Sequence, residues 1–174
     1  MPGALRRRNL IGLPALLALA GCGFTPLYGR RGDAPGPAEA GLGLTDVALI
    51  PERTGQLLRQ DLQARFDHGN APAAKRYQLV VSFSINSEGL GIAPDTTTTR
   101  VRFTGRAQWT LRRLDPTGAT LVTGAARAVD SLNTFDQQYF AQDIESQTVE
   151  RRIIREVASE ITEQLALWFR KHPA

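Results

Sequence analysis

Alternation of apolar and polar residues predicts three long strands in the middle of the chain. Apolar residues fill every odd position from Tyr77 to Ile85, and the same pattern dominates from Arg100 to Leu111. A third stretch, from Thr120 to about Val129, is poor in large residues and follows the turn sequence Asp115–Gly118. In that turn, proline fixes φ and the final glycine accepts a positive φ. Strands of this kind bury one face and expose the other, which is typical of antiparallel sheets.

The register of the predicted hairpin stays open at this point. A four-residue turn sets Gly124 opposite Trp109, whereas a bulged three-residue turn sets Ala125 there. Either small residue leaves room for the indole, so the sequence is compatible with both registers.

Apolar residues three and four positions apart predict two helices. The first runs from a cap at Thr54 to about Phe66, and the second from about Gln137 to Lys171, where the chain has neither Pro nor Gly. A short strand, from Leu44 to Ile50, precedes the first helix. The order β-α-β-β-β-α predicts an α+β fold, a two-layer sandwich in which both helices cover one face of a mostly antiparallel four-stranded sheet. The apolar stripe thins in the 140s, which leaves open whether the last helix is continuous.

The N-terminal pattern is that of a lipoprotein export signal. A basic cluster, 6–8, precedes an apolar run from Leu10 to Ala20 that is too short to span a bilayer, and Leu19–Cys22 resembles the bacterial lipobox. We therefore expect a cleaved signal peptide at 1–21 and a diacylglycerol and an N-acyl chain on Cys22. A Pro- and Gly-rich tether is expected at 22–43 and a single globular domain at 44–174. Apart from the acyl chains, no cofactor is predicted.

The charge balance argues against nucleic acid as a partner. The chain has 21 basic and 17 acidic residues, a net charge of +4, but three of the arginines lie in the predicted signal. The mature chain is therefore close to neutral, and any basic character is local.

No catalytic or metal-binding pattern is recognisable. The two histidines are His68, beside a predicted helix end, and His172, near the C-terminus. The sequence has no nucleophile–His–acid order, phosphate loop, zinc spacing or calcium loop. These features favour a binding protein that is not an enzyme, without a metal site.

The one concentrated positive surface lies on the strand that begins at Arg100. Its even positions place four guanidiniums on one face, namely Arg100, Arg102, Arg106 and Arg112. Such a face can simply be solvated, but arginine is the residue suited to forked contacts with phosphate and carboxylate. The preceding loop, 86–100, contains Leu90, Ile92 and Ala93, and is either a contact point or a plain linker.

Four segments together resemble the lipopolysaccharide-assembly lipoprotein family (LptE-like). They are LAGCGFTPLYG at 19–29, IPERTGQLLRQDLQARF at 50–66, TTTTRVRFTGRAQWTL at 96–111 and ERRIIREVASEITEQL at 150–165. The resemblance implies a lipid-anchored, periplasm-facing protein of the outer membrane. Such proteins plug a large β-barrel that inserts lipopolysaccharide into the outer leaflet, help the barrel to assemble and bind lipopolysaccharide. The arginine face would then meet lipid A phosphates or acidic groups inside the barrel.

Two other functions remain open. The first is an auxiliary lipoprotein of an ABC-type lipid transport system, which is also small, anchored and α+β. The second is a structural lipoprotein that binds the cell wall, although the sequence shows no recognisable loop pattern for it. Gly23, directly after the anchor, is not the Asp often linked to retention at the inner membrane, which favours the outer membrane.

Overall fold

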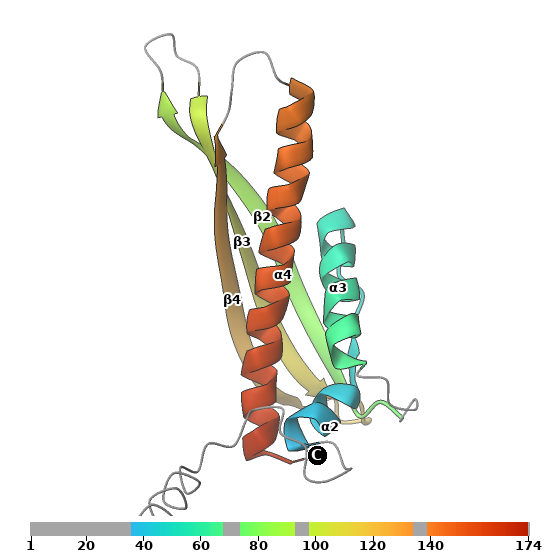
Figure 1. The fold of residues 1–174 in the computed structure, drawn as a ribbon. Helices are drawn as coiled ribbons and strands as arrows, with labels where there is room; N and C mark the ends of the chain where they lie inside the picture. The colour runs from blue at the N-terminus through green and yellow to red at the C-terminus, as the bar shows by residue number, and fades with distance from the viewer. Residues whose placement is uncertain (1–35, 68–73, 93–97, 134–138, 174) are drawn as a thin grey trace, which may run out of the picture.

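The fold is a two-layer α+β sandwich, as the pattern predicts (Figure 1). The computed structural model describes residues 36–67, 74–92, 98–133 and 139–173, so the predicted signal peptide and Cys22 lie outside the described part. One layer is a four-stranded sheet, and the other consists of three helices on one of its faces. The elements in chain order are α2 (Pro37–Gly43), β1 (Thr45–Val47), α3 (Arg53–Phe66), β2 (Tyr77–Ile92), β3 (Thr98–Arg113), β4 (Thr120–Asn133) and α4 (Tyr139–Lys171).

The sheet has the order β1-β2-β3-β4 and is mixed. Strands β2, β3 and β4 are antiparallel neighbours, as expected, but β1 pairs with β2 in parallel over Thr45–Val47 and Tyr77–Leu79. The parallel pairing follows from the connection, because α3 returns the chain to the end of the sheet where β1 began. Strands β2 and β3 are longer than predicted, and the tip between them, 93–97, lies outside the described residues.

The expected tether is wrong for residues 37–43, which form helix α2. Ala38 and Leu42 are buried, and a Cβ on Gly41 would lie 2.3 Å from ring atoms of Phe169 in α4. Pro37 suits the first helical turn. A helix of seven residues is too short to show a clear period, and packing rather than propensity holds it in place. The folded domain therefore begins before residue 44.

Helix α3 begins at Arg53, one residue before the predicted cap at Thr54. Its N-cap is Glu52, with φ of 65°, and no side chain caps this end. The turn is tight, since a Cβ on Gly55 would lie 2.7 Å from Cγ2 of Ile50. The early start therefore comes from packing of the helix end on the preceding chain, which capping rules do not describe.

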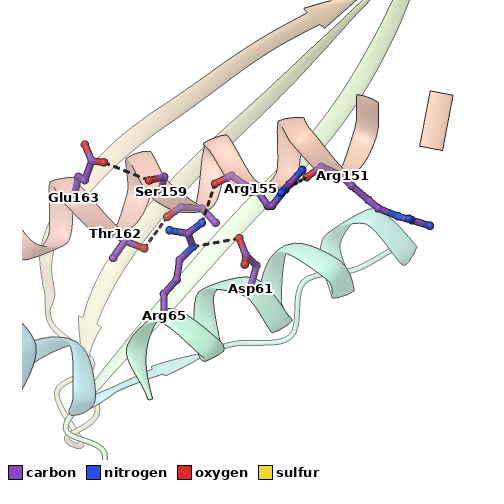
Figure 2. A network of polar contacts seen from close by, with 8 residues as sticks. Asp61, Arg65, Arg151, Arg155, Ser159, Thr162 and Glu163 are labelled. Atoms are coloured by element: carbon purple, nitrogen blue, oxygen red, sulfur yellow. Dashed lines mark hydrogen bonds and ion pairs between the residues drawn. The ribbon is translucent and has the colours of Figure 1, made fainter. Parts of the chain in front are cut away.

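Arg65 links the two long helices (Figure 2). Its Nε lies 3.2 Å from Oδ2 of Asp61 in α3, and its Nη2 donates to the carbonyl oxygen of Arg155 in α4 at 3.3 Å. This contact ties α3 to α4 on the side of the helix layer that faces away from the sheet.

Helix α4 is continuous over 33 residues, so the break considered in the 140s does not occur. It packs on β4 and β3 and approaches the sheet closely at Gly105, where an added Cβ would lie 2.3 Å from Cγ2 of Ile153. The β3–β4 register places Gly124 opposite Trp109, with an irregularity between Leu111 and Arg112. Of the two registers left open, the structure contains the one with Gly124 opposite Trp109. The chain reaches it through this irregularity and not through a plain four-residue turn, since the N–H of Arg113 donates to the carbonyl oxygen of Ala119.

Candidate basic face of the sheet

The face of the sheet opposite the helices is bare among the described residues (Figure 1). Odd positions of β3 such as Phe103, Trp109 and Leu111 are buried beneath the helices. The even positions point the other way, and all four predicted arginines are exposed on this bare face: Arg100, Arg102, Arg106 and Arg112. Alternation therefore predicted their common face correctly.

The four arginines are not equivalent. Two of them are paired with other side chains, and a third lies far from the centre of the strand. Arg100 donates from Nε and Nη2 to Oγ of Ser131, at 3.1 and 2.7 Å. Arg102 forms an ion pair with Glu88 across the β2–β3 ladder, with 3.1 Å between Nη1 and Oε1. Arg112 lies about 20 Å along the strand from Arg106, at a rise of ~3.4 Å per residue. Only Arg106 has both a central position and a guanidinium without a partner among the described residues.

Arg127 is the functional candidate that the sequence analysis missed. It lies in β4 directly opposite Arg106, and both side chains are exposed. Its guanidinium has no hydrogen bond or ion pair within the described part of the chain, while its backbone N–H donates to Oε2 of Glu160. Like charges directly opposite each other on a sheet are destabilising. An anion between the two guanidiniums would relieve that repulsion, and phosphate and carboxylate groups have the geometry for forked hydrogen bonds with arginine.

The register provides the signal that would have found Arg127. With Gly124 opposite Trp109, Arg106 faces Arg127, whereas with Ala125 there it would face Ala128. The two arginines are therefore neighbours only in the register that sets Gly124 opposite Trp109, and the sequence left the choice of register undecided.

The neighbours of the arginine pair on this sheet face have short side chains. Ser84 flanks Arg106 on β2, and the next row contains Thr104 and Val129, the latter 51% exposed. Arg127 also borders a hollow of about 330 Å³ between β4 and α4. Two charged residues of that hollow, Asp130 and Arg152, form an ion pair with each other at 2.8 Å. The arginine pair thus lies on an open and shallow surface. Such a surface suits a bulky anionic partner better than a small ligand, which needs an enclosed pocket.

The described residues show no grouping of three or more metal-ligating side chains. Within the same residues, no helix is both long enough and apolar enough to cross a membrane.

The molecule is a small α+β domain with a bare basic sheet face, and solved structures share this fold. A protein from Caulobacter crescentus assigned as a lipoprotein is 25% identical, with a TM-score of 0.61 over 76% of this chain and 95% of that chain. Rare lipoprotein B from Shewanella oneidensis is 11% identical, with a TM-score of 0.53 over 71% of this chain and 94% of that chain. Lipoprotein B from Nitrosomonas europaea is 15% identical, with a TM-score of 0.53 over 71% and 82% of the two chains.

The family is shown by the sequence itself. The family model described as LptE, lipopolysaccharide-assembly, matches residues 44–167, so the chain belongs to this family. The family consists of non-enzymatic lipoproteins associated with the outer membrane. No curated protein matches the chain.

Proposed function

We propose that this protein is an outer-membrane lipoprotein, anchored through acyl chains on Cys22 and facing the periplasm. It plugs and helps to assemble the β-barrel translocon for lipopolysaccharide, and it binds lipopolysaccharide during insertion into the outer leaflet. Membership of the lipopolysaccharide-assembly family supports the process. One observation carries the binding role: Arg106 and Arg127 lie opposite each other on the bare sheet face, and neither guanidinium has a partner among the described residues.

The arginine pair fits a ligand with several phosphate or carboxylate groups. Guanidinium forks make charge-assisted hydrogen bonds with such groups, and these bonds are stronger than neutral ones. In this proposal Arg106 and Arg127 hold the anion, and Arg100 and Arg102 flank it towards the hairpin tip. Arg112 is a more remote contact. The anion is a lipid A phosphate or an acidic group of the barrel lumen, and both present the same chemistry to the pair.

The proposal is tested by replacing both central arginines, Arg106→Ser with Arg127→Ser. We expect lipopolysaccharide to bind at least about tenfold more weakly, since hydrogen bonds to charged groups contribute about 1.5–3 kcal/mol each. The free energy of unfolding should not fall, because the change removes a repulsion. Titration of the mature protein with lipopolysaccharide measures the first quantity, and urea unfolding measures the second.

A matched control removes two arginines from the helix layer, Arg151→Ser with Arg170→Ser, which are also exposed. This variant should bind lipopolysaccharide as the parent protein does. Equal affinity of all three proteins would remove the arginine pair from the site. Co-purification tests the plug role, because the proposed function requires a large outer-membrane barrel, whereas an auxiliary transport subunit would bring down an inner-membrane complex.

A further inference from the structure

Strand β2 has a long unpaired edge. Its partner on that side, β1, pairs only with Tyr77–Leu79, although β2 continues to Ile92. The last main-chain hydrogen bond on this side comes from Ala48, the residue after β1, whose N–H donates to the carbonyl oxygen of Leu79 at 2.9 Å. Beyond Leu79, no other strand in the described part of the chain pairs with this side of β2.

The hydrogen bonds show which main-chain groups are open. Tyr77 donates its N–H to the carbonyl of Leu44 on the β1 side, whereas the carbonyl of Arg76 accepts from Leu114 on the β3 side. The N–H and C=O groups of successive residues in a strand point to alternate sides, so the main-chain groups of the odd residues of β2 point away from β3. Within the described residues no hydrogen bond reaches the outward N–H and C=O groups of the following positions: Val81, Phe83, Ile85, Ser87 and Gly89.

The opposite edge of the sheet is covered, in contrast. On β4, the carbonyl of Ala125 accepts from Nε2 of Gln164 at 3.0 Å, and the N–H of Arg127 donates to Glu160 at 2.9 Å. The amide of Gln164 and the carboxylate of Glu160 both belong to α4, so this helix covers the edge of β4 around Ala125 and Arg127. Unpaired edges are commonly blocked by Lys, Pro or a bulge. The edge of β2 from 81 to 92 has none of these, and its one charge, Glu88, is paired with Arg102.

The side chains along this edge are apolar on the helix side and incompletely covered. Val81 is buried, but Phe83 and Ile85 are only half-buried. Figure 1 shows the cause: α3 lies beside the lower part of β2 and ends well below the tip, while α4 packs over β3 and β4. The upper part of β2 thus offers open main-chain groups together with a strip of half-exposed apolar surface.

We propose that this edge, from Val81 to Gly89, accepts an extended segment of a partner protein as a fifth strand. Main-chain groups of the segment would pair with the odd residues of β2. Its apolar side chains would pack beside Phe83 and Ile85, and its polar side chains would lie on the side of Ser84 and Asn86. Such strand addition combines main-chain hydrogen bonds for affinity with alternate side chains for specificity.

A second copy of this chain fits the edge less well. An antiparallel copy centred on Ile85 would set Val81 opposite Gly89 and Phe83 opposite Ser87, so only Ile85 would face an apolar residue, its own counterpart. A copy centred on Phe83 would pair Val81 with Ile85, but this pairing is limited to residues 81–85, because β1 already occupies Tyr77–Leu79. A partner segment with apolar residues at alternate positions covers both apolar side chains. The inference concerns a different surface from the arginine pair and does not depend on what that pair binds.

The test follows amide hydrogen exchange in the mature protein with a ten-residue peptide of alternating Ile and Thr, with Lys at each end. In the free protein, the amides of Phe83, Ile85 and Ser87 should exchange quickly and those of the even residues slowly. The peptide should slow the odd amides at least tenfold and leave the even ones unchanged. Odd amides that stay fast at saturating peptide would overturn the proposal. Protection that rises with protein concentration alone would also overturn it, since a second copy would then be the occupant.

A pair of variants at Ser87 separates strand addition from adsorption. Ser87→Pro removes an outward N–H that has no partner in β3, so the fold should persist, and peptide affinity should fall at least tenfold. Ser87→Ala keeps the N–H and should bind normally. Equal binding by the two variants contradicts main-chain pairing. If a barrel protein co-purifies, its complex should show the same protection of odd amides. Failure of any barrel protein to co-purify would count against the proposed function and would leave the peptide result standing.

Discussion

Asp115 shows how one side chain fixes the β3–β4 turn. Oδ1 of Asp115 accepts hydrogen bonds from the hydroxyl of Thr117 and from the N–H groups of Thr117 and Gly118, the latter two at 3.0 and 3.2 Å. The Thr117 hydroxyl first, then these amides and the Arg113 charge, lower the pKa of Asp115 below its ordinary value of 3.8. A lowered pKa means that the ionised carboxylate stabilises the folded state.

We expect Asp115→Asn to lower the melting temperature slightly at pH 7. A carboxyl with a lowered pKa stabilises fully above its unfolded pKa, and the stabilisation is lost as the pH falls through the folded pKa. The difference between parent and variant should therefore be constant from pH 7 to 5 and vanish as the pH falls below 3.8. Thermal unfolding followed by circular dichroism across this range measures it. A difference that persists at the lowest pH would mean that shape, and not charge, causes the effect.

Gly124 is the residue that lets the indole of Trp109 pack closely against β4. An added Cβ would lie 2.3 Å from Cζ2 of the indole. Gly124→Ala should therefore destabilise the protein by about 1–3 kcal/mol, as overpacking does, and should shift the tryptophan fluorescence. The control is Gly43→Ala, whose Cβ would meet nothing closer than an oxygen of Phe66 at 4.0 Å. Urea unfolding should leave that control near the parent, and equal losses would contradict the packing explanation.

Helix α2 contributes to the core although its sequence looks like a linker. Leu42 is fully buried, whereas Leu49, in the segment after β1, is 74% exposed. Leu42→Ala should lower the free energy of unfolding by about 2–5 kcal/mol, the usual cost for a buried leucine. Leu49→Ala should change it by less than about 0.5 kcal/mol. Denaturant unfolding of both variants decides whether α2 belongs to the cooperative unit, and similar small losses would place it outside.

The sequence predicts those elements whose period extends over many residues. The long alternation in β2 and β3 and the long apolar stripe of α4 identify strands and helix without knowledge of their neighbours. It does not predict α2, because seven residues with Ala38 and Leu42 on one face show less than two full periods. It also does not predict that β1 is parallel, since three residues cannot indicate a direction of pairing. Those features depend on contacts between distant segments.

The candidate site divides in the same way. The face shared by Arg100, Arg102, Arg106 and Arg112 follows from alternation within one strand. The grouping of Arg106 with Arg127, and the neutralisation of Arg102 by Glu88, follow from pairing between strands. A one-residue change of register gives different neighbours, so the composition of a site across strands needs the structure.

The molecule as a whole keeps its two sheet faces distinct. The helices cover one face with the apolar core, and the other face holds arginines whose ionic partners are few among the described residues. Attraction of an anionic ligand to such an exposed face acts through solvent, so salt screens it. Apolar packing is not weakened by salt in this way. Ionic strength therefore separates recognition by the arginine face from recognition by apolar surface.

We expect lipopolysaccharide affinity to fall about tenfold between 0.1 and 1 M NaCl, because the Debye length shortens from about 10 to about 3 Å. The variant with Arg106→Ser and Arg127→Ser should lose less than about threefold over the same range, since the screened charges are gone. The control with Arg151→Ser and Arg170→Ser should behave as the parent does. Titrations at each salt concentration, with unfolding measured in parallel, provide the comparison. If parent and double variant show the same salt dependence, the charges that attract the ligand lie elsewhere. The bare face then serves a partner that does not need its central arginines.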